Sequence, residues 1–247
     1  MSTAVVDERD LVEAAGRATI YSLVAVGFAW PTAEKKKTLE SILLPAADSL
    51  DLPTTLDIAV AAVDDAAPDD LEALRSAHMG LFPPVASSDA PGYETAYRGD
   101  GIFQQSAMLA DIAGFYRAHG LRAGGSERER LDHITVEVEF MALLARKELS
   151  ALQVQGPDEV EVCRQTAKSF LKDHLGCWAP AFGRRAASIS SHRWYQALGK
   201  LLDVWVEADA AAFGVTPVEV ADNPLPQEAP DDGGCGPCPL PTAGSFQ

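Results

Sequence analysis

Cysteine is scarce in this chain, and the four cysteines are unevenly placed, at Cys163, Cys177, Cys235 and Cys238. They are too few for the dense disulfide framework of a small secreted protein. Cys163 falls on an apolar helical stripe, where a cysteine behaves as a small core residue. The cysteine content is therefore compatible with a reducing compartment.

Long apolar runs are also missing. The longest, residues 21–30, is about half the length that a bilayer-spanning helix needs. The N-terminus does not show a positively charged segment followed by an apolar segment and a cleavage site, which are the marks of an export signal. We therefore expect a cytosolic protein that inserts into no membrane.

Positive charge is the third shortage. The 20 lysines and arginines are outnumbered by 36 aspartates and glutamates, which gives a net charge of −16. An acidic surface repels nucleic acid and anionic lipid and attracts basic partners. Nucleic acid is therefore not expected as a partner. Taken alone the acidity indicates solubility, and it gains further meaning only if a basic ligand is proposed on other grounds.

Catalytic and nucleotide-binding motifs are absent from the sequence, which has no P-loop, GxGxxG, HExxH or GxSxG. Glu129 and His133, like His133 and Glu137, are spaced four apart. That spacing favours a helix salt bridge over the Glu-x-x-His pairs of a di-metal helical bundle. We predict that the chain is not an enzyme and holds no metal in its helical part.

Apolar residues repeating every three to four positions predict a series of helices. The helices are expected over residues 7–30, 33–47, 54–63, 68–80, 102–119, 129–155, 158–174 and 193–213. A short irregular apolar piece is expected at 178–182, where Pro180 interrupts the pattern. No β-branched segment alternates with period two. The prediction is an all-α fold with a single compact, bundle-like helical domain over residues 1–214.

The composition changes abruptly after Gly214. Residues 215–247 contain seven prolines, four glycines and five acids but no lysine or arginine, which indicates a disordered or loosely attached tail. Its Cys235-Gly236-Pro237-Cys238 motif leaves a dithiol redox or metal-carrier function open as an alternative. Against that alternative, prolines follow the motif directly, so no helix is expected to lower a thiol pKa. A second ligand pair that would complete a zinc site is also missing.

An irregular segment of about twenty residues, 81–101, interrupts the helical pattern. Loops of this length are usually either functional or disordered. Its aromatic residues Phe82, Tyr93 and Tyr97 indicate a segment ordered against the body, with a floppy connection as the alternative. A short polar hinge, residues 122–126, leads from the following helix into the next one.

The stretch from Glu129 to Lys147 organises the rest of the domain. Its apolar residues form two opposed stripes, as in a central helix with neighbours on both sides. Asp132 and Glu139 share a polar face between the stripes. Asp132 and His133 have two interpretations. In the first, they provide favourable electrostatics at the helix N-terminus, with a half-buried histidine. In the second, they form the polar lip of a groove for a basic peptide, because carboxylates match the paired N–H groups of a guanidinium.

At these residues the chain resembles the TorD/DmsD/NarJ family of chaperones dedicated to molybdenum oxidoreductases. Residues 129–133, Glu-Arg-Leu-Asp-His, resemble the family's Glu-x-Pro-Asp-His motif, with Leu131 in place of the proline. Leu81-Phe82 matches its Leu-Phe pair, and residues 91–95 resemble its Pro-aromatic-Glu-Ser segment with an extra glycine. Residues 170–175 followed by Trp178 are similar to a later helix. The resemblance covers about residues 10–214.

Within the family, the pattern that includes the tail is most similar to chaperones of the type II dimethyl sulfoxide reductase class, which accompany enzymes of dimethyl sulfide, ethylbenzene, selenate and chlorate. The resemblance implies a cytosolic chaperone that binds the twin-arginine leader of a molybdoenzyme catalytic subunit. It would hold that subunit until its molybdopterin guanine dinucleotide is inserted, before export. The chaperone itself would carry no cofactor.

Carried over to this sequence, the resemblance assigns peptide binding to one group of residues. These candidates are Leu81, Phe82, Tyr93, Glu94, Glu129, Asp132 and His133. We expect the acids to bind the leader arginines and the apolar groups to bind its hydrophobic stretch. Glu139, on the predicted face of Asp132, is expected to strengthen the negative potential.

Overall fold

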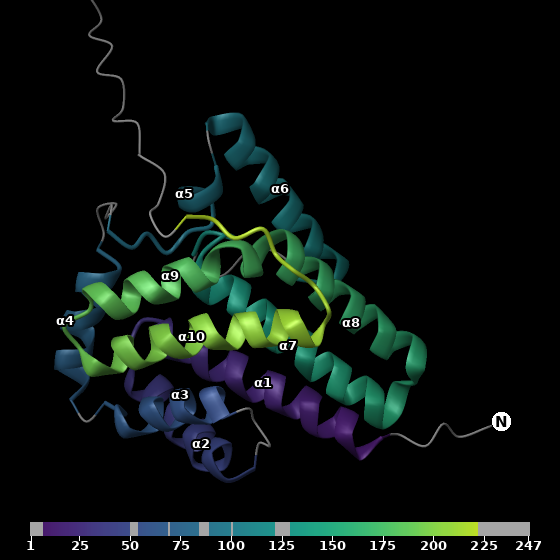
Figure 1. The fold of residues 1–247 in the computed structure, drawn as a ribbon, viewed down its shortest axis with the longest axis horizontal. Helices are drawn as coiled ribbons and strands as arrows, with labels where there is room; N and C mark the ends of the chain where they lie inside the picture. Colours follow the sequence, from purple (N-terminus) through teal and green to yellow (C-terminus); the bar gives the residue numbers. More distant parts are fainter. Residues whose placement is uncertain are drawn as a thin grey trace, which may run out of the picture.

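The computed structural model describes residues 7–49, 54–68, 70–83, 89–99, 101–121 and 129–221. Within these ranges the chain is helical apart from turns, loops and one isolated β-bridge, so the all-α prediction is confirmed there. In chain order the elements in Figure 1 are α1 (Glu8–Phe28), α2 (Ala33–Ser49), α3 (Thr54–Asp65), α4 (Leu71–Leu81), α5 (Thr95–Arg98), α6 (Ile102–Ala118), α7 (Ile134–Ser150), α8 (Pro157–Phe170), α9 (Gly176–Ile189) and α10 (Arg193–Ala212). Two π-helical turns, η1 (Ala151–Gln155) and η2 (Leu171–Leu175), follow α7 and α8.

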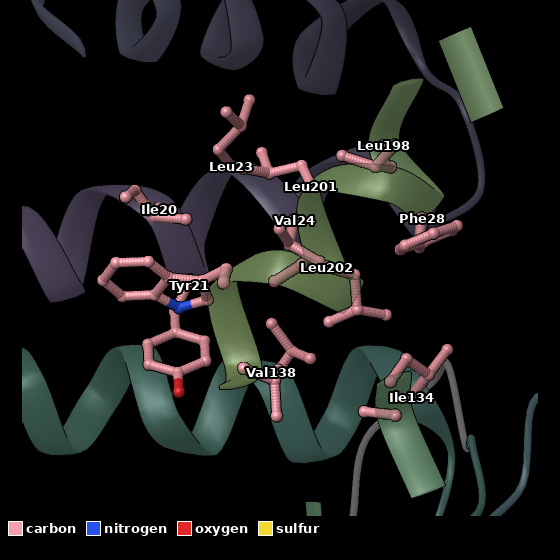
Figure 2. Packing of buried hydrophobic residues seen from close by; sticks show 14 of the residues in the cluster. Ile20, Tyr21, Leu23, Val24, Phe28, Ile134, Val138, Leu198, Leu201 and Leu202 are labelled. Carbon is pink, nitrogen blue, oxygen red and sulfur yellow. The ribbon is translucent and has the colours of Figure 1, made fainter. Parts of the chain in front are cut away.

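The core lies where three helices far apart in the sequence meet. α1 contacts both α7 and α10, and α10 lies beside α9 (Figure 1). In Figure 2, Tyr21 and Val24 of α1 point toward Val138 of α7 and Leu202 of α10, and all four side chains are buried. Burying an aliphatic side chain of this size contributes roughly 1.5–3 kcal/mol. α7 contacts α8 as well as α1, which confirms the prediction of a central helix with neighbours on both sides.

Among the described helices, α1 is long and apolar enough to cross a membrane by length and composition. Of its most apolar 18-residue window, 56% is buried inside the protein. A helix in the core of a folded domain meets the same criteria, and α1 occupies such a position between α7 and α10.

α7 begins later than predicted, at Ile134 instead of Glu129. The backbone of His133 is extended, and this residue forms an antiparallel β-bridge with Tyr93. The side chain of His133 then accepts the N–H of Thr135 as the N-cap of the helix. Asp132 therefore precedes the helix and His133 caps it: the carbonyl oxygen of Asp132 accepts the N–H of Glu94 in another segment, while that of His133 accepts the N–H groups of Val136 and Glu137 in the first helical turn.

The expectation of an irregular piece at residues 178–182 was wrong, because α9 continues through Pro180. Proline lacks an N–H and normally interrupts a helix. Here it lies in the second turn of α9, which directly follows the π-helical turn η2. Helical spacing places Trp178 and Phe182 on one face, and both are fully buried.

The domain extends beyond the predicted boundary at Gly214. The N–H of Val220 donates to the carbonyl oxygen of Cys177 at 3.0 Å, and Val215 packs against the core. A loosely attached tail beginning at residue 215 is therefore the wrong description of residues 215–221. Residues 222–247, with both tail cysteines, and the predicted hinge at 122–126 lie outside the described residues, so the predictions made for them stay predictions.

Two glycines allow α9 and α10 to approach closely. A Cβ atom on Gly199 would lie 2.5 Å from the carbonyl oxygen of Gly183 and 2.9 Å from the backbone nitrogen of Ala187. Real side chains do not approach backbone atoms so closely, so a larger residue would force the two helices apart. The α9–α10 pair is thus specified by the absence of side chains at this contact.

We expect Gly199→Ala to lower the free energy of unfolding by about 1–3 kcal/mol, because overpacking displaces backbone as well as side chains. Gly114→Ala in α6 is the matched control, since nothing lies within 4 Å of its Cβ position. The control should gain roughly 0.5–1 kcal/mol from its better helix propensity. Urea denaturation measures both changes, and equal effects of the two substitutions would contradict the close helix contact.

Candidate functional site

A groove of about 1520 Å³ opens beside the start of α7. Its walls come from the second half of α1, from α6, from α7 and from residues 81–83, 90–93, 129–131 and 133. The apolar lining residues include Ala25, Val26, Leu81, Phe82, Leu109, Val136 and Leu143. Segments between Ser22 and Arg146 that are far apart in the sequence therefore meet at one opening.

The loop that contains Tyr93 is attached to the start of α7 by backbone hydrogen bonds. Ile134 N–H donates to the carbonyl oxygen of Gly92 at 2.9 Å, and Glu94 N–H donates to that of Asp132 at 2.9 Å. A Cβ atom on Gly92 would lie 2.7 Å from Phe82 Cε1 and 2.9 Å from His133 Nε2. The glycine that departs from the family pattern is thus required here by close approach of the backbone to two rings. The described part of the loop, 89–99, is ordered against the body, as predicted.

His133 combines a structural role with a place in the groove. Its Nδ1 atom accepts the N–H of Thr135 at 3.3 Å and lies 2.7 Å from Thr135 Oγ1. Its ring lies 5.3 Å from that of Phe82 and 5.1 Å from that of Tyr93, centroid to centroid. Burial lowers the pKa of His133 to about 3, and the nearby His78 and Arg130 add to the effect. The neutral ring is therefore part of an aromatic wall.

Asp132 does not present a free carboxylate at the lip of the groove, which corrects the sequence prediction. Its side chain is 0% exposed. Oδ2 accepts the backbone N–H of Thr95 at 3.2 Å and the hydroxyl of the same residue at 2.7 Å. Arg130 donates to Oδ1 from Nε at 3.1 Å and to Oδ2 from Nη2 at 3.0 Å. Internal donors therefore occupy both carboxylate oxygens.

Glu94 is also buried and lies below the groove instead of in its wall. It forms an ion pair with Arg98 and lies 3.0 Å from Nδ1 of His174. Glu137, buried nearby, accepts the indole N–H of Trp178 at 3.0 Å. Burial, followed by the charge of Glu94, raises the pKa of Glu137 well above its usual range.

This buried acidic layer was missed by the sequence reasoning, which assigned Glu94 to a guest peptide and Glu137 to a helix salt bridge with His133. A signal was available: Glu137 lies within one helical turn of apolar residues that are predicted to be buried. A carboxylate at such a position needs an internal partner. The partners, Trp178 and Glu94, come from other parts of the chain and could not be identified from spacing.

Five of the predicted residues are brought together in the groove, namely Leu81, Phe82, Tyr93, Glu129 and His133. Of these, Leu81 is buried, Phe82 and Tyr93 are half-buried and Glu129 is exposed. The hydroxyl of Tyr93 lies 3.5 Å from Oε1 of Glu129. Asp132 and Glu94 are the two candidates that the structure places behind the wall.

A second exposed carboxylate, Glu139 of α7, also lines the groove. Partial burial raises its pKa, while the positive charges of Lys35 and Arg146 act in the opposite direction. Sequence reasoning also missed His78, whose ring contacts that of Phe82 at 4.8 Å and whose Nε2 lies 3.0 Å from the carbonyl oxygen of Phe28. The groove thus combines apolar residues, stacked rings, the two exposed acids and the cationic side chains of Lys35, Arg130 and Arg146.

Among the described residues, no group of three or more His, Cys, Asp or Glu side chains is arranged to hold a metal ion. Fold and groove define an all-helical protein with an open, largely apolar groove. The model of the family described as nitrate reductase delta subunit matches residues 47–184, more than half of the chain. The chain belongs to this family, the TorD/NarJ family that its motifs predicted.

Similar proteins have names that agree with this family. The selenate reductase assembly chaperone of Thauera selenatis is 32% identical over 49% of this chain and 60% of its own length. The chlorate reductase assembly chaperone of Ideonella dechloratans is 30% identical over 59% of this chain and 73% of its own length. Chaperone protein TorD of Vibrio cholerae is 28% identical over 52% of this chain and 57% of its own length. The chain thus spans about 60% of the length of the selenate reductase chaperone and of TorD, and all three names describe chaperones rather than catalysts.

We expect the buried His133 to make the protein less stable in acid. Its folded-state pKa of about 3 lies below the unfolded value of 6.5, so the unfolded chain binds more protons as the pH falls below about 6.5. His133 should then lower stability progressively, by up to roughly 1.4 kcal/mol per pH unit, until the pH approaches 3. Urea denaturation of the protein between pH 7 and about pH 5 measures this slope.

His133→Asn is the comparison, because asparagine can cap α7 but does not titrate. The variant should be less stable at pH 7, because it loses ring contacts, yet its stability should fall less steeply with pH. Parallel pH profiles for the two proteins would show that His133 does not titrate as a buried neutral group.

Proposed function

We propose that this chain is a cytosolic chaperone that binds the twin-arginine leader of a molybdoenzyme catalytic subunit and holds that subunit until its cofactor is inserted, before export. Membership of the nitrate reductase delta subunit family and similarity to reductase assembly chaperones support the chaperone role. The observation that carries the leader-binding proposal is the groove, in which an apolar floor is combined with exposed acids. The molybdopterin cofactor belongs to the client in this proposal.

The apolar floor suits the hydrophobic stretch of a leader. Phe82 and Tyr93 are half-buried, as are Val136 and Leu143 of α7. Each therefore has apolar surface that a bound peptide can cover, and each buried CH₂ group of the peptide contributes about 0.8 kcal/mol. A peptide-sized groove with a few polar groups at its edge is typical of helix and extended-peptide recognition.

The exposed carboxylates suit the arginines that precede the hydrophobic stretch. Glu129 and Glu139 line the groove, whereas Asp132 and Glu94 are already paired internally. A carboxylate accepts two parallel N–H bonds from a guanidinium, and such charged bonds are stronger than neutral ones. The net charge of −16 attracts a cationic leader over a longer range. In the free protein the two exposed acids, and not Asp132, are therefore open to the leader arginines.

We expect Glu129→Gln and Glu139→Gln each to weaken binding of a twin-arginine peptide about two- to fivefold, because surface ion pairs contribute roughly 0.5–1 kcal/mol. Glu159→Gln on α8 removes the same charge outside the groove and is the control. Added salt should weaken binding to the parent protein more than to the double variant. Fluorescence anisotropy with a labelled leader measures all five proteins, and equal affinities would remove these acids from the peptide site.

The holding function requires a client subunit. A tagged chain should co-purify with a cofactor-free molybdoenzyme catalytic subunit that bears its leader, and less of it when the leader arginines are replaced by glutamine. Size-exclusion chromatography of the co-expressed pair measures the complex. Full complex formation with a leaderless subunit would place recognition elsewhere, and absence of any complex would refute the chaperone assignment for that client class.

A further inference from the structure

Arg130 makes a set of contacts that resembles a bound ligand in a guanidinium site. Its Nε and Nη2 atoms donate to the two oxygens of Asp132 at 3.1 and 3.0 Å. Nη2 also donates to Thr95 Oγ1 at 2.8 Å. The guanidinium carbon lies 4.7 Å from the ring centroid of Tyr93. Proteins recognise arginine with three features of this kind: a carboxylate that accepts two parallel N–H bonds (here called the carboxylate fork), a hydroxyl acceptor and an aromatic face.

The receptor half of this contact is rigid, while the occupant is not. Asp132 is 0% exposed and is held by the backbone and hydroxyl of Thr95, independently of Arg130. The Arg130 side chain is 49% exposed and lines the groove. It can leave by side-chain rotation alone, and the carboxylate that it uncovers would then need another cationic partner, because a desolvated charge without a partner is costly.

We propose that Asp132, Thr95 and Tyr93 form a guanidinium-binding site occupied by the chain's own Arg130, and that an arginine of the bound peptide replaces it. The proposal rests on the proposed leader-binding function. The ring of Tyr93 contacts the guanidinium of Arg130, and the hydroxyl of Tyr93 contacts the carboxylate of Glu129. Two consecutive arginines can therefore bind on either side of one tyrosine, the first at the exposed Glu129 and the second in the Asp132 fork.

Exchange of one guanidinium for another explains selectivity for arginine over lysine without a large cost in free energy. The fork to Asp132, the bond to Thr95 and the contact with Tyr93 are broken for Arg130 and formed again for the guest. Lysine cannot reproduce the bidentate fork, so a lysine-bearing peptide would break these bonds without replacing them. The internal occupant thus rejects cations other than guanidinium groups, in addition to keeping Asp132 paired in the empty protein.

The decisive variant is Arg130→Ala, tested in the full chain with and without L-arginine amide. Arginine amide should raise the Tm of this variant in a saturable manner, and L-lysine amide should not at equal concentration and ionic strength. The parent protein and Arg117→Ala, which removes an exposed arginine of α6, should not show the arginine-specific rise. In Arg130→Ala/Asp132→Asn the rise should disappear, because the carboxylate fork is gone.

Peptide binding provides the second measurement. Because self-competition is removed, Arg130→Ala should bind a twin-arginine peptide roughly fivefold more tightly or better, the lower range for coupling between two ligands. A twin-lysine peptide should gain less. If Arg130→Ala does not fold, Arg130→Lys retains the charge without the fork and should show the same gain for the twin-arginine peptide.

The outcomes separate this inference from the proposed function. A folded Arg130→Ala that shows no arginine-specific stabilisation, or that binds the twin-arginine peptide no better than the parent protein does, overturns the exchange. Arginine-specific stabilisation in a protein that binds no leader peptide in any form supports the guanidinium site and refutes the proposed leader binding. Stabilisation together with tighter peptide binding supports both.

Discussion

The groove depends on the junction between residues 92–95 and the start of α7. Backbone hydrogen bonds join Gly92 to Ile134 and Glu94 to Asp132, and the Asp132 side chain adds two bonds from Thr95. The junction forces His133 out of the helix and against Tyr93. The wall of the groove therefore forms only when residues 92–95 are attached to the start of α7, and the buried carboxylate of Asp132 lies at the centre of this junction.

Below the junction, three acids are buried in one region, and their charges must be compensated. Asp132 is paired with Arg130, Glu94 with Arg98 and His174, and Glu137 with the indole of Trp178. Burial and the nearby charge of Glu94 raise the pKa of Glu137. Buried ion pairs add little net stability, but removal of one partner is costly. The layer therefore fixes the relative positions of α5, α7 and α9.

The division between buried and exposed acids gives the groove its character. Charges that hold the structure together lie behind the wall, while Glu129 and Glu139 face the opening. Arg130 links the two regions, because it pairs with the buried Asp132 and also lines the groove. A cation that enters the groove thus meets a surface whose most specific position is already occupied by a residue of the protein itself.

Much of this protein was determined by local sequence. Periodicity predicted most of the described helices within a few residues, as at Arg193–Ala212, although it missed α5 and α9. An apolar stripe and a capping residue are properties of neighbouring positions. Short motifs identified the family and five residues that line one groove.

The errors concern the start of α7, the helix through Pro180, the packed residues 215–221 and the burial of Asp132. At the start of α7, in residues 215–221 and at Asp132 the outcome depends on a partner far away in the chain. The residues that carry charge were thus determined by sequence, and only tertiary packing decided which of those charges face water, because desolvation depends on what covers a group and not on its neighbours in sequence.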